Sequence, residues 1–202
     1  MKTKTRNILI GLLITLAVIF SMYSCISGTY NSMIELDEQV KQQWAQVENQ
    51  YQRRYDLIPN LVETVRGYAK HESDVLIQVT EARASVGGMI KIDESILEDE
   101  EKMAQFQKIQ DSLSGALQRL LSVTENYPEL KANQNFLALQ DQLEGTENRI
   151  SIERKRYNET AQEYNTKIRR FPNAFIANMF GFKTKAYFSA AVEAQTAPKV
   201  EF

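Results

Sequence analysis

Apolar residues recur along most of the chain in alternating steps of three and four, the spacing of one face of an α-helix. The stretch from Arg53 to Arg83 carries this pattern at Ile58, Leu61, Val65, Tyr68, Val75, Leu76, Val79 and Ala82. Glu72 occupies one position of the seam where an apolar residue is expected. Helices with one apolar face bury that face against each other, so the pattern predicts an all-α helical bundle.

Chain breakers divide the pattern into four long helices and an aromatic tail. Pro59 lacks a backbone donor and clashes with the preceding turn, so it predicts a helix break. Gly87 and Gly88 predict a helix end, as does Pro128, and residues 89–99 are expected to form an acidic loop. Short connections favour antiparallel neighbours. The predicted elements are helices over residues 31–56, 59–86, 100–125 and 130–169, and a short C-terminal helix and tail over 172–202 packed on an elongated antiparallel four-helix bundle.

The first thirty residues predict a membrane anchor. Lys2, Lys4 and Arg6 precede an apolar run over residues 8–26, which is about the ~20 residues that cross a bilayer as a helix. Positive flanks stay on the cytoplasmic side of a membrane. We therefore expect residues 1–29 to form a cytoplasmic stub and a single-pass transmembrane helix in the inner membrane. The bundle of residues 30–202 is then extracytoplasmic.

Cys25, the only cysteine, leaves an alternative open. A basic start followed by an apolar run also fits a secretory signal, and Cys25 lies where a lipidated cysteine would lie. Of the residues before it, only Ser24 is small, which makes a poor lipoprotein cleavage site. We favour an uncleaved anchor in which Cys25 is a small apolar residue, with a lipoprotein as the alternative.

Composition excludes some classes of protein. The chain is 43% hydrophobic and 25% charged, with 8 Gly and 4 Pro, which is typical of a helix-rich domain with a core and not of a disordered chain. The net charge of −2 does not fit the basic surface that nucleic acid requires.

Catalytic patterns are weak. His71 is the single histidine, and Val75 stands where a zinc protease would place its second one. A di-iron bundle needs two Glu-x-x-His motifs on facing helices, which a chain with one histidine cannot supply. Serines are plentiful, but none lies in a Gly-x-Ser-x-Gly elbow. We therefore predict no enzyme activity, no metal and no cofactor.

Several charged residues lie near the apolar seams, where buried ions must be paired. We expect them to make interhelical contacts, with Glu72 or Glu147 bonding an arginine of another helix; the alternative is a polar interior groove in a ligand-sensing bundle. The candidates are Arg53, Arg54, Glu72, Arg83, Glu147 and Arg154.

The tail supplies a second candidate surface. Phe175, Ile176, Met179 and Phe180 are predicted to form one face of a short amphipathic helix. We favour a lid on the bundle core for this face; the alternative is that it contacts the membrane or a partner.

Short motifs along nearly the whole chain resemble the LemA family of bacterial membrane-anchored proteins. They include Tyr30-Asn31, the run Arg53 to Val62 (RRYDLIPNLV), Gly67-Tyr68, His71-Glu72, Thr80 to Arg83, Glu125 to Ala132, Glu144 to Asn148, Arg156-Tyr157-Asn158, Phe171-Pro172, Gly181-Phe182 and Tyr187-Phe188. The resemblance implies an anchor, an all-helical bundle and no established enzymatic activity. Members are often encoded beside other membrane proteins, so we expect a scaffold or adaptor that binds an unidentified membrane or envelope protein.

Overall fold

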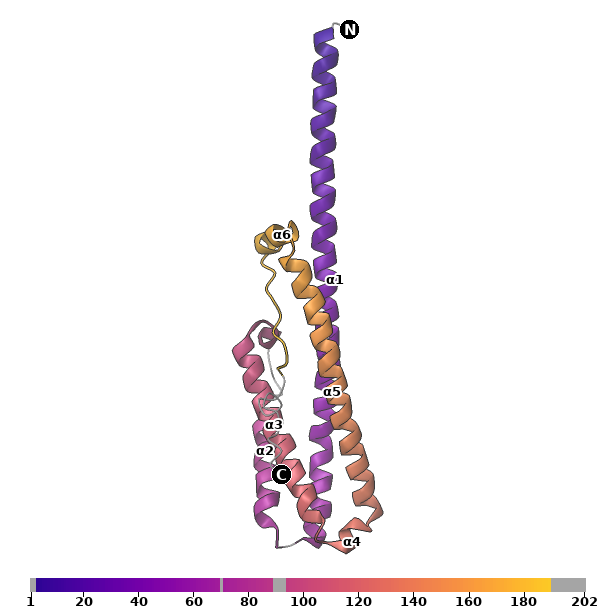
Figure 1. Cartoon of the computed structure of the whole chain (residues 1–202), viewed down its shortest axis with the longest axis vertical. Helices are drawn as coiled ribbons and strands as arrows, with labels where there is room; N and C mark the ends of the chain where they lie inside the picture. Colours follow the sequence, from indigo (N-terminus) through magenta and orange to yellow (C-terminus); the bar gives the residue numbers. More distant parts are fainter. Residues whose placement is uncertain (1–2, 70, 89–93, 190–202) are drawn as a thin grey trace, which may run out of the picture.

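The computed structural model describes residues 3–69, 71–88 and 94–189. These are almost entirely helical: α1 (Thr3–Tyr68), α2 (Ser73–Gly87), the 3₁₀ helix η1 (Glu94–Glu98), α3 (Glu100–Thr124), α4 (Pro128–Lys131), α5 (Gln134–Arg169) and α6 (Asn173–Phe180). α1, α2, α3 and α5 alternate in direction, and α4 joins α3 to α5 at the far end (Figure 1). The predicted antiparallel helical bundle is therefore confirmed.

α1 joins the predicted anchor to the bundle without a break. Its 66 residues make a rod about 100 Å long. Residues 7–25 are all exposed, and this part projects alone beyond the bundle (Figure 1). It is long and apolar enough to cross a membrane. The remainder of α1 packs along α5, which is the most extensive helix contact in the described chain.

The predicted break at Pro59 is wrong, because α1 continues through it. A helical proline leaves the carbonyl four residues earlier without its usual donor. That carbonyl belongs to Tyr55, and Arg83 of α2 donates to it from Nε at 3.3 Å. The chain instead turns between Tyr68 and Ser73, so the predicted helix 59–86 is split between α1 and α2.

Other boundaries agree more closely. α3 begins where Asp99 caps it, with its carboxylate accepting from the amides of Glu101 and Lys102 at 3.0 and 3.1 Å. α5 begins a few residues later than expected, because Asn133 caps it by accepting from Phe136 N at 3.0 Å. The expected acidic loop contains η1, whose Ile96 and Leu97 are buried; residues 89–93 lie outside the described chain.

The core has two parts. Near α6, aromatic rings dominate, and Trp44 contacts the rings of Phe106, Tyr157 and Phe188 at centroid distances of 5.6, 5.6 and 5.9 Å. Toward the far end the core is mainly aliphatic. Its members there include Ile58, Leu61, Val65, Val79, Leu113, Leu120 and Leu143. These residues come from the stripes that the spacing predicts, so hydrophobic burial holds the four helices together.

The C-terminal part folds back on the bundle. α6 follows Phe171–Pro172 and is capped at its C-terminal end by Gly181. The φ of Gly181 is 78°, a left-handed conformation that glycine adopts without steric cost. Residues 182–189 then run in an extended conformation beside α3 and α5 (Figure 1). Of the predicted tail, residues 190–202 lie outside the described chain.

Candidate functional site

Arg54 is the most buried charged side chain of the described core, at 1% exposed. Its guanidinium joins three helices of the bundle. From α1, Nη1 donates to Ser114 Oγ of α3 and to Glu147 Oε1 of α5, both at 2.7 Å. Nη2 donates to the side-chain oxygen of Gln110, also on α3. Three helices are thereby held in register, which is the structural use of a buried polar contact.

The other predicted contacts do not join this cluster. Arg53 is exposed. Glu72 accepts from the hydroxyl of Tyr127 at 3.0 Å, and it pairs with no arginine among residues 3–69, 71–88 and 94–189. Arg83 lies over the ring of Tyr55 at 3.8 Å.

Arg154 contacts the extended C-terminal segment instead. Nη2 donates to Ser189 O at 3.4 Å, the guanidinium lies 4.7 Å from the ring of Phe188, and Asp111 of α3 is 3.8 Å away. Glu72, Arg83 and Glu147 each have a different partner: Tyr127, Tyr55 and Arg54 respectively. The alternative of an interior groove flanked by these three residues therefore has no support among the contacts of the described residues.

Three side-chain amides clamp the extended segment. Asn165, Asn158 and Gln107 each accept from one backbone amide and donate to the carbonyl of the same residue, at distances between 2.7 and 3.0 Å. The clamped residues are Lys185, Phe188 and Ser189 respectively.

The spacing of the clamp follows from helix and strand geometry. Asn158 and Asn165 are two helical turns apart, about 10.5 Å along α5. Lys185 and Phe188 are three extended residues apart, about 10 Å. Sequence reasoning did not assign this role, although two asparagines at this spacing on the buried face of a helix were a visible signal.

Lys185 is a buried cation that sequence reasoning also missed. Its Nζ lies 2.8 Å from Asp37 of α1 and 3.2 Å from Glu98 of η1. Burial alone would raise the pKa of the Asp37 carboxyl, but the hydrogen bonds and charges of Lys185 and Lys41 outweigh it and hold that pKa below its ordinary value. The pKa of Glu98 is likewise lowered, because Lys185 and Lys183 outweigh its desolvation.

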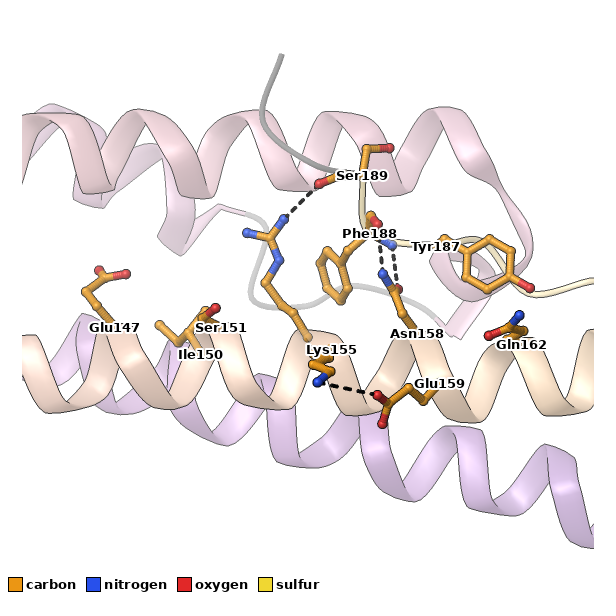
Figure 2. A pocket seen from close by; sticks show the side chains of 11 residues that line it. Glu147, Ile150, Ser151, Lys155, Asn158, Glu159, Gln162, Tyr187, Phe188 and Ser189 are labelled. Atoms are coloured by element: carbon orange, nitrogen blue, oxygen red, sulfur yellow. Dashed lines mark hydrogen bonds and ion pairs between the residues drawn. The ribbon is translucent and has the colours of Figure 1, made fainter. Parts of the chain in front are cut away.

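A groove of about 720 Å³ lies between α5 and the extended segment. Figure 2 shows one wall of the groove on α5, formed by Lys155, Asn158, Glu159 and Gln162. The opposite wall is formed by Tyr187 to Ser189 of the extended segment. Lys155 and Glu159 pair across one turn at 3.8 Å. The groove is open and its lining is as apolar as it is polar, with charges of both signs along its wall.

A second groove, of about 740 Å³, lies on the other side of α5 against α1. Glu159 and Gln162 line both grooves. The remaining lining is largely polar and charged, from Ser32, Glu35, Gln39, Glu163, Thr166, Lys167 and Arg170. We call the exposed surface of α5 where the two grooves meet, around Glu159 and Gln162, the α5 face.

α6 exposes part of the predicted apolar face. Phe175, Met179 and Phe180 are at least half exposed, but Ile176 is buried against the bundle. The alternative, in which all four residues share one outward face, is therefore wrong for Ile176. α6 covers the core with Ile176 and Ala177 and presents its aromatic side outward.

Within the described residues, no group of three or more His, Cys, Asp or Glu side chains is arranged to hold a metal ion. His71 lies exposed in the turn between α1 and α2.

The fold and these surfaces define a membrane-anchored, all-helical bundle. The model of the LemA family matches residues 43–202, and the chain belongs to that family.

Curated relatives agree with this assignment. The chain is 28% identical to Magnetosome protein MamQ 2 of Paramagnetospirillum magneticum over 177 residues, covering 79% of this chain and 64% of that protein. It is 26% identical to Magnetosome protein MamQ of Magnetospirillum gryphiswaldense over the same shares. It is 22% identical to Protein LemA of Metamycoplasma hominis, covering 89% of this chain and 76% of that one. The chain thus spans a little under two thirds of the length of the MamQ relatives.

Proposed function

We propose that the protein is a membrane-anchored scaffold that binds another membrane or envelope protein through the α5 face. The observation that carries this proposal is the pair of grooves that meet at Glu159 and Gln162, far from the anchor's tip and exposed along one helix. Charges of both signs beside a shallow groove are suited to bind a partner protein with a polar surface, because complementary charges determine which partner binds.

The build of α1 supports a scaffold role. About 40 residues of α1 follow the apolar run, so the helix extends some ~60 Å from the membrane without a flexible joint. Arg54 ties α3 and α5 to α1, and the amide clamp holds the extended segment to α5 and α3. A rigid stem of this kind presents a binding face at a set height. The proposal assigns the bundle a binding role and no catalysis.

Crosslinking in intact cells tests the binding role. A photoreactive amino acid replaces Gln162, and a matched control carries it at Ser85, which is exposed on α2. We expect position 162 to give one discrete adduct and position 85 to give none, and Glu159→Arg to abolish the adduct. Adducts of equal yield at both positions, or none at either, would refute the α5 face as a binding surface.

We further propose an N-terminus in the cytoplasm and a bundle outside the inner membrane. Lys2, Lys4 and Arg6 before the apolar run support this orientation. In a Cys25→Ser background, Ser85→Cys should react in intact cells with a maleimide that cannot cross membranes. Reaction only after lysis would reverse the orientation. The intact mass of the native chain separates an acylated Cys25, the lipoprotein alternative, from an uncut N-terminus.

A further inference from the structure

α6 and Phe171, two residues before it, expose an unusual amount of apolar surface for a bundle exterior. Phe171 is 94% exposed, Phe175 74% and Met179 55%. Phe175 and Met179 are four residues apart, so they lie on one side of the helix. Elsewhere on the described bundle, large exposed apolar residues such as Ile77 and Leu137 occur singly, which is ordinary for a protein surface.

Ring contacts set the position of α6 relative to the anchor. Phe180 and Phe182 lie 4.8 and 5.7 Å from the ring of Tyr30 on α1. Tyr30 is four residues beyond the apolar run that ends at Ile26, a distance of about 6 Å along the helix. α6 therefore lies where α1 leaves the hydrocarbon core, which is the depth that aromatic side chains favour in membrane proteins.

Figure 1 agrees with this position, because α6 caps the end of the bundle from which the unaccompanied part of α1 projects. The end of α5 also lies there, and it carries the exposed cations Arg169 and Arg170. Basic side chains beside an apolar helical face are the combination that binds lipid headgroups and the acyl boundary together.

We propose that Phe171, Phe175 and Met179 insert into the bilayer leaflet on the bundle's side of the membrane, which makes α6 a second membrane contact. The occupant of this face is the lipid surface, because the face is continuous with the membrane-spanning part of α1. Two contacts restrict the tilt of the stem, so the α5 face is held at a defined height and orientation. This inference requires the anchor but not a protein partner.

Lipid quenching in vesicles tests the insertion. The full chain, in a Cys25→Ser background, carries Phe175→Cys labelled with an environment-sensitive fluorophore. The matched control is Ile77→Cys on α2, exposed to 52% in the native chain and distant from the anchor. The vesicles contain phosphatidylcholine, phosphatidylglycerol and spin-labelled lipid, at about one chain per vesicle. We expect lipid quenching at position 175 to exceed that at 77 by roughly fivefold, with a blue-shifted emission.

Equal quenching at the two positions would overturn the proposal. So would a label at 175 that is shielded from aqueous iodide but not quenched by lipid, because that result indicates cover by protein. Phe175→Asp, with Ile77→Asp as its control, gives an independent readout. Since both side chains are exposed, neither variant should shift the melting temperature appreciably. Only Phe175→Asp should broaden the distribution of distances between a label at position 129 and a dye on the lipid headgroups, because it removes the contact that restricts the tilt of the stem. An unchanged distribution would also overturn the proposal.

Discussion

Replacing Lys185 with methionine should loosen the C-terminal segment from the bundle in a pH-dependent way. The substitution keeps an unbranched stem of similar length but removes the cation between Asp37 and Glu98. Asp37 is 15% exposed at its side chain and Glu98 is 35% exposed. The variant therefore leaves one largely buried carboxylate without its closest counter-ion.

The size of the effect follows from that burial. Removing one partner of a buried ion pair costs about 3 to 5 kcal/mol, and the hydration of Glu98 favours the lower end, about 3 kcal/mol. That loss corresponds to a change of roughly 150-fold in the unfolding equilibrium at 25 °C, and to a fall in melting temperature of about 9 °C for a chain of this length. Lys183→Met is the control, because Lys183 is 71% exposed and its one ion pair in the described part of the chain is with Glu98 at 3.3 Å. Its cost should stay below about 0.5 kcal/mol.

The pH dependence has a definite sign. The pKa values of Asp37 and Glu98 are lowered in the folded protein, so their contribution to stability is present above their ordinary values of 3.8 and 4.5. It is lost as pH falls through the lowered values. In the variant, burial without Lys185 disfavours the ionised Asp37 carboxyl, and protonation relieves the penalty. The difference in unfolding free energy between wild type and variant should therefore be largest near neutral pH and should narrow as pH falls toward and below the ordinary value of 3.8 for Asp37.

Urea unfolding of the full chain in detergent, followed by Trp44 fluorescence, measures both effects. Trp44 is the only tryptophan and stacks on Phe188 at 5.9 Å, so its emission reports undocking of the segment directly. If Lys185→Met destabilised no more than Lys183→Met at pH 7, or if the gap stayed constant down to pH 3, the ion pairs would not hold the segment.

Three further outcomes test the fold. Arg54→Met should lower the free energy of unfolding by about 2 kcal/mol by leaving its polar partners unpaired, and an unchanged urea midpoint would contradict that role. Arg83→Met should lower the free energy of unfolding by about 1 kcal/mol in the native chain. It should lower it by less in a Pro59→Ala background, because the backbone N–H at position 59 then donates to the Tyr55 carbonyl. Equal losses in the two backgrounds of this double-mutant cycle would show that Arg83 does not compensate for Pro59. Gly87→Ala should destabilise the protein, because its Cβ would lie 2.9 Å from the Tyr55 hydroxyl. Gly145→Ala should stabilise it by about 0.5 to 1 kcal/mol, because a Cβ there meets no atom of the described residues within 4 Å. Thermal melts that reverse this order would contradict the packing.

Hydrophobic spacing predicted the helices well because it is a local property. Val40, Trp44 and Val47 fall on one face of any helix that contains them, and the structure buries all three. Pro59 misled the prediction for a tertiary reason. The carbonyl that a proline leaves unpaired would be costly in an isolated helix, but Arg83, on another helix, donates to it.

The candidate site was less accessible to sequence reasoning. Arg54 and Glu147 were singled out because both are charged residues near the apolar seams, and they lie in contact. Lys185 was not singled out, since it sits in a tail without helical periodicity, and nothing local indicates that Asp37 will lie beside it.

The sequence alone determined the anchor, the long helices and the residues that face the core, because apolar periodicity and chain breakers act within a few turns of the chain. Only the tertiary structure decided that α1 runs unbroken through Pro59, that Asn158 and Asn165 clamp an extended segment, and that α6 lies beside Tyr30. Each of these depends on groups far apart in the chain, whose contacts form only once the helices have packed.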